Sequence, residues 1–181
     1  DVYKRQKLYK LDLSFNKKEI YELPEFVTAT SIKSDNELIF ATNSGLKLFN
    51  MSNKKFVSIV NIEDQELSTR SNDGASDAYG RFWFGTMQNN FDKEGNDIPI
   101  KNNIGKLYKI DLNNKVNIVE ESLGIPNTFV WSPDNSKFYF TDTLNGTILS
   151  YDFDLESGLL SNKKDFASFN RGLPDGSTID L

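Results

Sequence analysis

Lys106-Leu107-Tyr108-Lys109-Ile110-Asp111 is the stretch that decides the fold, because nearly the same six residues occur earlier as Lys7-Leu8-Tyr9-Lys10-Leu11-Asp12. A looser copy spans residues 147–152, and a shorter one spans residues 46–49. Three of these four copies directly follow a glycine, which is typical of a strand that leaves a tight turn. The repeats therefore predict strands that recur along the chain.

A second unit, a polar turn followed by an apolar strand, precedes each of the last three copies. Its instances are Ser34–Phe40, Asp77–Phe84 and Pro133–Phe140. Equivalent positions recur at intervals of about 40 to 60 residues, which is the spacing of propeller blades. Helical periodicity is poor throughout, so the sequence predicts an all-β chain and favours a β-propeller over a sandwich. The longest spacing holds an insertion at residues 88–103, which we expect to be a long surface loop near a binding site.

The repeats divide one domain, residues 1–181, into roughly three complete blades and pieces of two more. The second piece would begin near Asp180. Residues 1–6 fit none of the repeats, so a foreign origin for them stays open. Because a propeller protects its edges by closing, we expect these 181 residues alone to be inactive and unstable or aggregation-prone through open edges.

Composition limits the chemistry. The 181 residues contain no Cys, which excludes disulfides and thiolate metal sites, and no His, which excludes histidine-activated nucleophiles and imidazole ligands. Any catalysis must therefore use carboxylates, amides, Arg, Lys, Tyr or a metal held by oxygen. The net charge is −5 without a basic patch, so we expect no nucleic-acid partner. No apolar run has the length of a membrane span and no signal peptide is visible, so we expect a cytoplasmic protein without a membrane partner.

Three segments are more specific than a strand repeat requires. They are Thr69–Gly74 with Gly85-Thr86-Met87, Gly124–Asn127 with Trp131–Asp134 and Asp142-Thr143, and Gly172–Gly176. Taken singly, Asn-Asp-Gly and Pro-Asp-Gly are ordinary turn formers, and that interpretation is favoured for each one alone. Likewise, the aromatic residues nearby are expected to fill the core rather than to bind a ligand. These residues are Phe82, Trp83, Phe138 and Tyr139.

The segments together favour a binding site. Equivalent positions of successive propeller blades converge on one central channel, so Arg70, Asn72, Asn127 and Asp175 are expected to meet there. Amide and carboxylate oxygens are hard ligands that suit Ca²⁺, Mg²⁺ or Mn²⁺, and Zn²⁺ also accepts carboxylates.

Three sets of motifs resemble, in the same order, those of the gluconolactonase, regucalcin (senescence marker protein) and luciferin-regenerating enzyme family. The first set is Arg-x-Asn-Asp-Gly with Gly-Arg-Phe-Trp-x-Gly-Thr-Met, the second is Pro-Asn with Trp-Ser-Pro-Asp and Asp-Thr, and the third is Pro-Asp-Gly. The resemblance runs from Leu8 to Leu181. It implies a six-bladed β-propeller, of which roughly four blades' worth are present here, with one divalent metal in the central channel. It also implies that Asn127 and Asp175 bind the metal, that Asp175 is catalytic, and that Arg70 and Asn72 bind substrate.

This sequence departs from the family at three places. The family's Glu ligand lies in a Glu-Gly-Pro segment that this chain lacks, and neither Glu22 nor Glu25 is assigned to that role. The residue after the ligand Asn is commonly Gly, whereas here it is Thr128, and we expect the loop to differ locally because a β-branched residue disfavours positive φ. Lys101 stands roughly where some relatives place an acidic substrate contact.

The resemblance implies hydrolysis of a sugar lactone to its aldonic acid with one divalent ion, for which Ca²⁺ is expected first and Zn²⁺, Mg²⁺ or Mn²⁺ are alternatives. Three other functions stay open: an esterase or phosphotriesterase on the same scaffold, a calcium-binding propeller without turnover, and a purely structural repeat protein. The sequence leaves the particular lactone and the oligomeric state open.

Overall fold

The computed structural model describes residues 7–64, 68–92 and 94–180. Residues 1–6, for which a foreign origin was left open, lie outside the described residues. A hairpin of β1 (Lys7–Asp12) and β2 (Lys17–Glu22) precedes three four-stranded antiparallel sheets. These sheets consist of β3 (Val27–Ser34), β4 (Glu37–Thr42), β5 (Gly45–Asn50) and β6 (Lys55–Asn61); β7 (Thr69–Ser76), β8 (Phe82–Gln88), β9 (Gly105–Ile110) and β10 (Val116–Leu123); and β11 (Pro126–Trp131), β12 (Lys137–Asp142), β13 (Thr147–Asp154) and β14 (Leu159–Ser168). The all-β prediction is confirmed.

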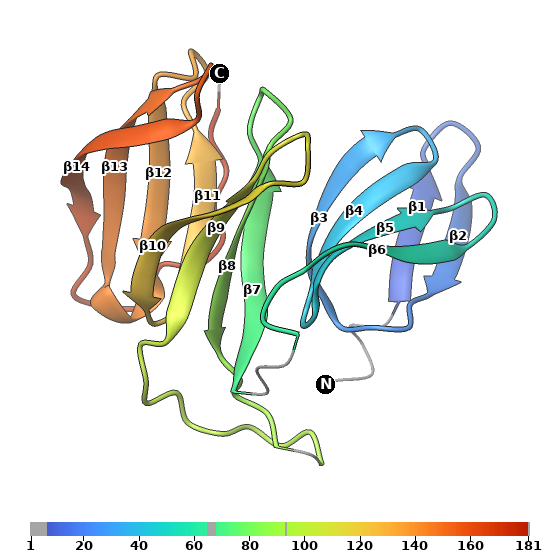
Figure 1. Ribbon diagram of the computed structural model, residues 1–181, viewed down its shortest axis with the longest axis horizontal. Helices are drawn as coiled ribbons and strands as arrows, with labels where there is room; N and C mark the ends of the chain where they lie inside the picture. Colours follow the sequence, from blue (N-terminus) through green and yellow to red (C-terminus); the bar gives the residue numbers. More distant parts are fainter. Residues whose placement is uncertain (1–6, 65–67, 93, 181) are drawn as a thin grey trace.

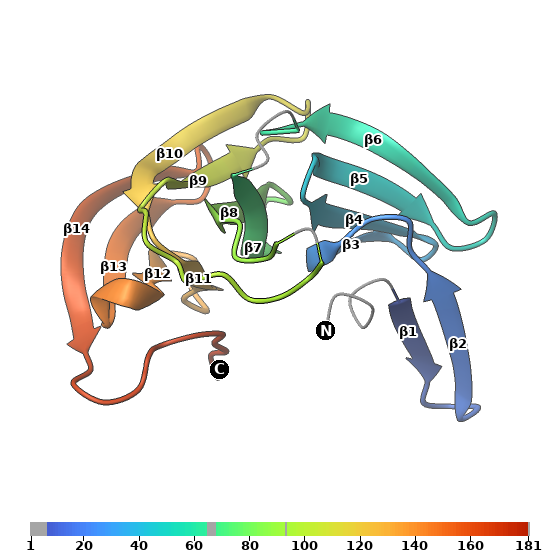
Figure 2. The same ribbon diagram turned by 90° about the horizontal axis from the view of Figure 1, so that it is seen from below.

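The sheets are blades of an incomplete propeller (Figure 1). Seen from below, they follow one another around an arc, with the first strand of each blade on the inner side and the last on the outer side (Figure 2). The inner strands are β3, β7 and β11, and the outer strands are β6, β10 and β14. The inner strands therefore surround a common centre.

The two sequence repeats each occupy one position in the blade. The Lys-Leu-Tyr-Lys-like copies form the third strands β5, β9 and β13, and the earliest copy forms β1. The polar-turn units lead into the second strands β4, β8 and β12. Among the described residues, no strand follows β14, and because these residues end at Asp180, the further strand unit expected to begin there stays a prediction. Nor does any described helix have the length and apolar character needed to cross a membrane.

Aromatic side chains fill the contact between the second and third complete blades. Trp83 on β8 is fully buried and packs on Phe138 of β12, with ring centroids 5.4 Å apart. Trp131 packs on the same ring at 4.8 Å. Phe82 is also buried, as expected, whereas Tyr139 is half-buried and contacts the exposed ring of Phe166. The core prediction holds for three of its four aromatic residues.

The buried cations of Arg81 and Lys109 link these two blades by hydrogen bonds to the turn between β13 and β14. The guanidinium of Arg81 donates to the carbonyls of Leu155 and Glu156, and Lys109 Nζ donates to the carbonyls of Ser157 and Gly158. Burial lowers the pKa of Lys109, and the nearby positive charge of Arg81 lowers it further. These hydrogen bonds hold the second complete blade against the third, and hence β7 against β11.

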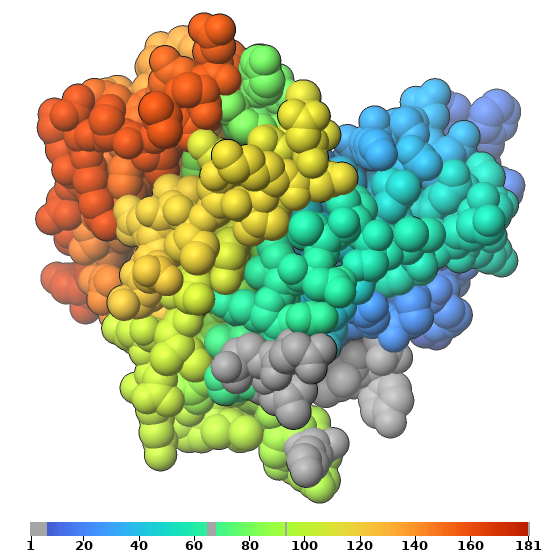
Figure 3. All heavy atoms as spheres, in the orientation of Figure 1, coloured from blue at the N-terminus to red at the C-terminus, as the bar shows by residue number. Residues whose placement is uncertain are grey.

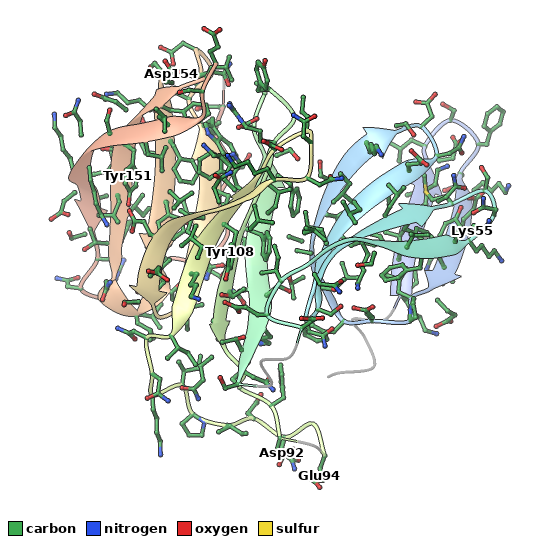
Figure 4. The ribbon with its side chains drawn as sticks, in the orientation of Figure 1. Lys55, Asp92, Glu94, Tyr108, Tyr151 and Asp154 are labelled. Carbon is green, nitrogen blue, oxygen red and sulfur yellow. The ribbon has the colours of Figure 1, made fainter. Side chains whose placement is uncertain are left out.

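The predicted long loop joins β8 to β9 and protrudes from the lower end of the molecule (Figure 3). Asp92 and Glu94 lie at its tip, away from the sheets (Figure 4). The base of the loop is held by Gln88, whose Oε1 accepts the backbone N–H groups of Lys101 and Asn102, each at 2.9 Å. The loop is therefore anchored at the end of β8, and within it an isolated antiparallel bridge pairs Phe91 with Asp97.

Candidate functional site

A cavity of about 360 Å³ lies where the inner strands converge. It is lined by Val27, Thr28, Arg70, Asn72, Asp73, Asn127, Asp175 and Gly176. All four residues singled out from the sequence are in this set, although they come from β7, β11 and the segment after β14. The structure thus brings the four together, while the role of each stays a prediction.

A bulge in β7 places two successive side chains of the Asn-Asp-Gly segment at the cavity. Neighbouring residues of a regular strand point to opposite faces, but the pairing of β7 with β8 slips between Ser71 and Gly74, and both Asn72 and Asp73 line the cavity. A Cβ on Gly74 would lie 2.4 Å from the Trp83 carbonyl oxygen, so the close approach of the strands requires glycine. The interpretation of Asn-Asp-Gly as a turn is therefore wrong.

Asn127 at the start of β11 is held in one orientation. Its Nδ2 donates to Thr143 Oγ1 at 2.7 Å, and its Oδ1 accepts from Asn72 Nδ2 at 3.2 Å. Asn72 Nδ2 also lies 3.0 Å from the Pro126 carbonyl oxygen. Because an amide oxygen has two lone pairs, Asn127 Oδ1 retains acceptor capacity for a cation.

Thr128 has a φ of 61°, in the left-handed region that β-branched residues disfavour. The backbone here nevertheless adopts a conformation that glycine accepts readily; the expected local difference from the loop of relatives stays a prediction. A hydrogen bond offsets the strain, because Thr128 Oγ1 donates to the Asp175 carbonyl oxygen at 2.8 Å. The Thr128 N–H also lies close enough to the Asp73 carboxylate to lower the pKa of that group.

The Pro174-Asp175-Gly176 segment lies beside β11 and is not a turn, which corrects the second turn interpretation. Thr143, in the short 3₁₀ helix η2 (Thr143–Asn145), donates from its hydroxyl to the Pro174 carbonyl oxygen at 2.8 Å. Thr128 holds the next carbonyl, that of Asp175. The Asp175 residue is exposed to the cavity and to solvent.

Two carboxylates share the cavity. Burial raises the pKa of Asp73 above its usual range; the Gly74 N–H opposes this rise, and the negative charge of Asp175 adds to it. A cation bound between the two acids would relieve their repulsion. Among residues 7–64, 68–92 and 94–180 no three His, Cys, Asp or Glu side chains cluster, so the available donors are two carboxylates and the Asn127 amide. This hard oxygen set fits a divalent ion that completes its shell with water or substrate.

Arg70 connects the cavity to the long loop. Its Nε donates to Asn90 Oδ1 at 2.8 Å, and its NH1 donates to Asn72 Oδ1 at 3.2 Å. The guanidinium carbon lies 5.9 Å from the ring centroid of Phe26 and 5.5 Å from that of Phe91. Because Asn90 and Phe91 belong to the loop, the start of the loop is placed at the cavity wall.

Lys101 is exposed and is not among the cavity-lining residues. Two other loop residues, Asn90 and Phe91, contact the candidate substrate-binding residue Arg70 instead, and sequence reasoning missed both. Asp73 was also missed, although it directly follows Asn72.

Glu25 makes its contacts away from the cavity. Its Oε2 accepts from Ser44 Oγ at 2.7 Å, and its Oε1 lies 3.5 Å from Lys47 Nζ.

Comparison with known proteins agrees with this architecture. The family model described as the SMP-30/Gluconolactonase/LRE-like region matches residues 1–181. The pentonolactonase XacC of Haloferax volcanii is 37% identical over 114 residues, covering 62% of this chain and 35% of that protein. The 6-deoxy-6-sulfogluconolactonase of Pseudomonas putida is 26% identical over 176 residues, covering 96% of this chain and 57% of that protein.

Among solved structures, the calcium-binding protein regucalcin of Agrobacterium tumefaciens superimposes with a TM-score of 0.83 at 25% identity, covering 96% of this chain and 57% of that one. This chain spans about half the length of the curated relatives it matches.

Proposed function

Because the chain belongs to the SMP-30/gluconolactonase/LRE-like family, we propose that the protein containing it hydrolyses a sugar lactone to the aldonic acid with the help of one divalent ion. The observation that supports this most is the joint presence of Arg70, Asn72, Asn127 and Asp175 around one cavity. Relatives named pentonolactonase and 6-deoxy-6-sulfogluconolactonase point to the same class of substrate.

Asn127 Oδ1 and the Asp175 carboxylate would hold the ion, and Ca²⁺ is the first candidate because a related structure is that of a calcium-binding protein. Zn²⁺, Mg²⁺ and Mn²⁺ remain alternatives. Bound there, the ion supplies a Lewis acid for the ester carbonyl of the lactone. Asp73 adds a second negative charge to the cavity and so favours cation binding.

The chain's own residues supply base catalysis and positioning. The Asp175 carboxylate accepts a proton from the attacking water, whose oxygen bonds to the carbonyl carbon. When the bond between that carbon and the ring oxygen breaks, the protonated Asp175 returns the proton to the ring oxygen, and the new carboxylic acid releases its proton to solvent. Arg70 and Asn72 orient the hydroxyls or the ring ester of the sugar, which contributes through positioning. Arg70 also carries positive charge beside a reaction that develops an oxyanion and releases a carboxylate.

The test uses a whole-propeller protein that contains these residues, stripped of metal and then supplied separately with Ca²⁺, Mg²⁺, Mn²⁺ or Zn²⁺. Acid release from lactones, aryl esters and phosphotriesters is followed with a pH indicator. Metal-restored turnover of lactones is the expected result. Turnover of aryl esters or phosphotriesters alone would favour another hydrolase, and metal binding without any turnover would favour a calcium-binding propeller.

A further inference from the structure

Thr128 combines a strained backbone with an unusually connected side chain. At a φ of 61° a glycine would be unstrained, whereas a threonine is disfavoured. Strain of this kind persists where surrounding contacts over-determine the conformation, and it is concentrated at functional sites. The gain that accompanies threonine here is its hydroxyl, which donates to the Asp175 carbonyl oxygen at 2.8 Å.

The contacts of Thr128 join three parts of the cavity. Its hydroxyl donates to the Asp175 carbonyl oxygen, and its backbone directly follows Asn127 on β11. Its N–H lies close enough to the Asp73 carboxylate on β7 to lower the pKa of that group. Thr143 completes the arrangement, because its hydroxyl accepts from Asn127 Nδ2 at 2.7 Å and donates to the Pro174 carbonyl at 2.8 Å. Two threonine hydroxyls thus hold two consecutive carbonyls against β11.

The segment that bears Asp175 has little regular structure to order it. Residues 169–180 form no strand in the described part of the chain, and most of them are exposed. A carboxylate on such a segment has a defined position only through local contacts. Without the Thr128 hydroxyl, the Asp175 carbonyl would lose its hydrogen bond, and the bond from Thr143 to the Pro174 carbonyl would hold the segment less closely to the Asn127 amide.

We propose that Thr128 is a positioning residue that fixes Asp175 relative to Asn127 and thereby sets the affinity of the cavity for a divalent ion. The inference rests on the proposed function only for the nature of that ligand. Residues that orient metal ligands typically change metal affinity by about 10- to 100-fold when they are removed. Loss of the Thr128 hydroxyl should act in the same way.

Three variants of the whole-propeller protein separate the hydroxyl from the backbone strain. Thr128→Val keeps the shape and the strain but loses the hydroxyl, Thr128→Ser keeps the hydroxyl, and Thr128→Gly loses both the hydroxyl and the strain. Amide hydrogen exchange across residues 172–178, measured without metal, reports the order of the segment. Calcium titration calorimetry reports the affinity.

In Thr128→Val, exchange is expected to be faster and Ca²⁺ affinity about tenfold lower, with both restored in Thr128→Ser. Thr128→Gly should lose Ca²⁺ affinity as Thr128→Val does, but it should unfold no more readily than the wild type. A merely structural role of Thr128 would not produce weaker binding without lower stability. Wild-type exchange and affinity in both hydroxyl-free variants would overturn the inference. If the wild type bound no divalent ion, the proposed function would fail, while the metal-free exchange data would still decide whether Thr128 orders the segment.

Discussion

Asn72 on β7 and Asn127 on β11 meet side chain to side chain, with Asn72 Nδ2 3.2 Å from Asn127 Oδ1, although 55 residues separate them in the chain. The bond crosses from one blade to the next at the centre of the propeller. It connects a proposed substrate-binding residue to a proposed metal ligand. Through Arg70, which donates to Asn72 Oδ1, the connection extends to the long loop.

Arg70→Gln should weaken substrate binding without removing the metal. The substitution takes away a charged donor at the cavity wall, and hydrogen bonds to charged groups are typically worth about 10- to 100-fold in affinity. We expect KM for the lactone to rise by about that factor while Ca²⁺ affinity is unchanged. Steady-state kinetics and calorimetry measure the two effects. The control is Lys101→Gln, which changes an exposed loop cation outside the cavity and should leave KM unchanged. An unaltered KM in Arg70→Gln would show that Arg70 does not bind the substrate.

The recurrence of strands along the chain could be predicted from the sequence, because two strand positions of the blade have their own sequence patterns. Lys106–Asp111 and Lys7–Asp12 are nearly the same residues, and the structure places both copies in strands, β9 and β1. The convergence of Asn127 and Asp175 also followed from the repeat, since equivalent positions of blades share one centre.

The fine structure of the site could not be predicted in this way. The bulge that places Asp73 beside Asn72 at the cavity depends on how closely β7 approaches β8, a property of strand pairing. The positive φ of Thr128 contradicts local propensity and is accompanied by a hydrogen bond to Asp175, which is distant in sequence. Asn90 was missed because a long loop has no repeat that would place its residues.

Gly85→Ala should destabilise the fold and disturb the site at once. A Cβ on Gly85 would lie 2.1 Å from Pro126 Cβ, so β8 and β11 would have to separate next to Asn127. Overpacking of this kind costs about 1–3 kcal/mol in the free energy of unfolding, and we also expect weaker Ca²⁺ binding. Urea unfolding and calorimetry measure both. Gly176→Ala, where a new Cβ meets nothing within 4 Å, should leave the free energy of unfolding unchanged.

Asp77→Asn should cost roughly 3 kcal/mol of stability, because it leaves the Arg81 charge buried without its partner. The Asp77 carboxylate is fully buried and accepts from Arg81 Nε at 2.7 Å and from Trp83 Nε1 at 2.9 Å. The comparison is Lys137→Gln, which breaks an exposed pair with Asp152 and should have no measurable effect. Equal urea midpoints for the two variants would show that the buried network does not support the fold.

Asp134 should titrate far below the usual range of an aspartate. The Ser132 hydroxyl, followed by the N–H and hydroxyl of Ser136, lowers the pKa of Asp134 to about 2. A lowered folded-state pKa gives stability that is present above the unfolded pKa of about 4 and is lost as the pH falls through about 2. The difference in unfolding free energy between the wild type and Asp134→Asn should therefore narrow between about pH 4 and pH 2. A carboxyl titration near pH 4, followed by NMR, would contradict this.

The most direct measurement is the Ca²⁺ affinity and lactone turnover of Asp175→Asn in the whole-propeller protein, beside the wild type and Asn127→Ala. Asp175→Asn keeps the size of the side chain but loses the negative charge and the base, so turnover should fall by about 100-fold or more and metal affinity should fall in both variants. Thermal unfolding of the metal-free proteins checks that the fold is retained. Full lactone turnover in Asp175→Asn would contradict the assignment of this cavity as the active site.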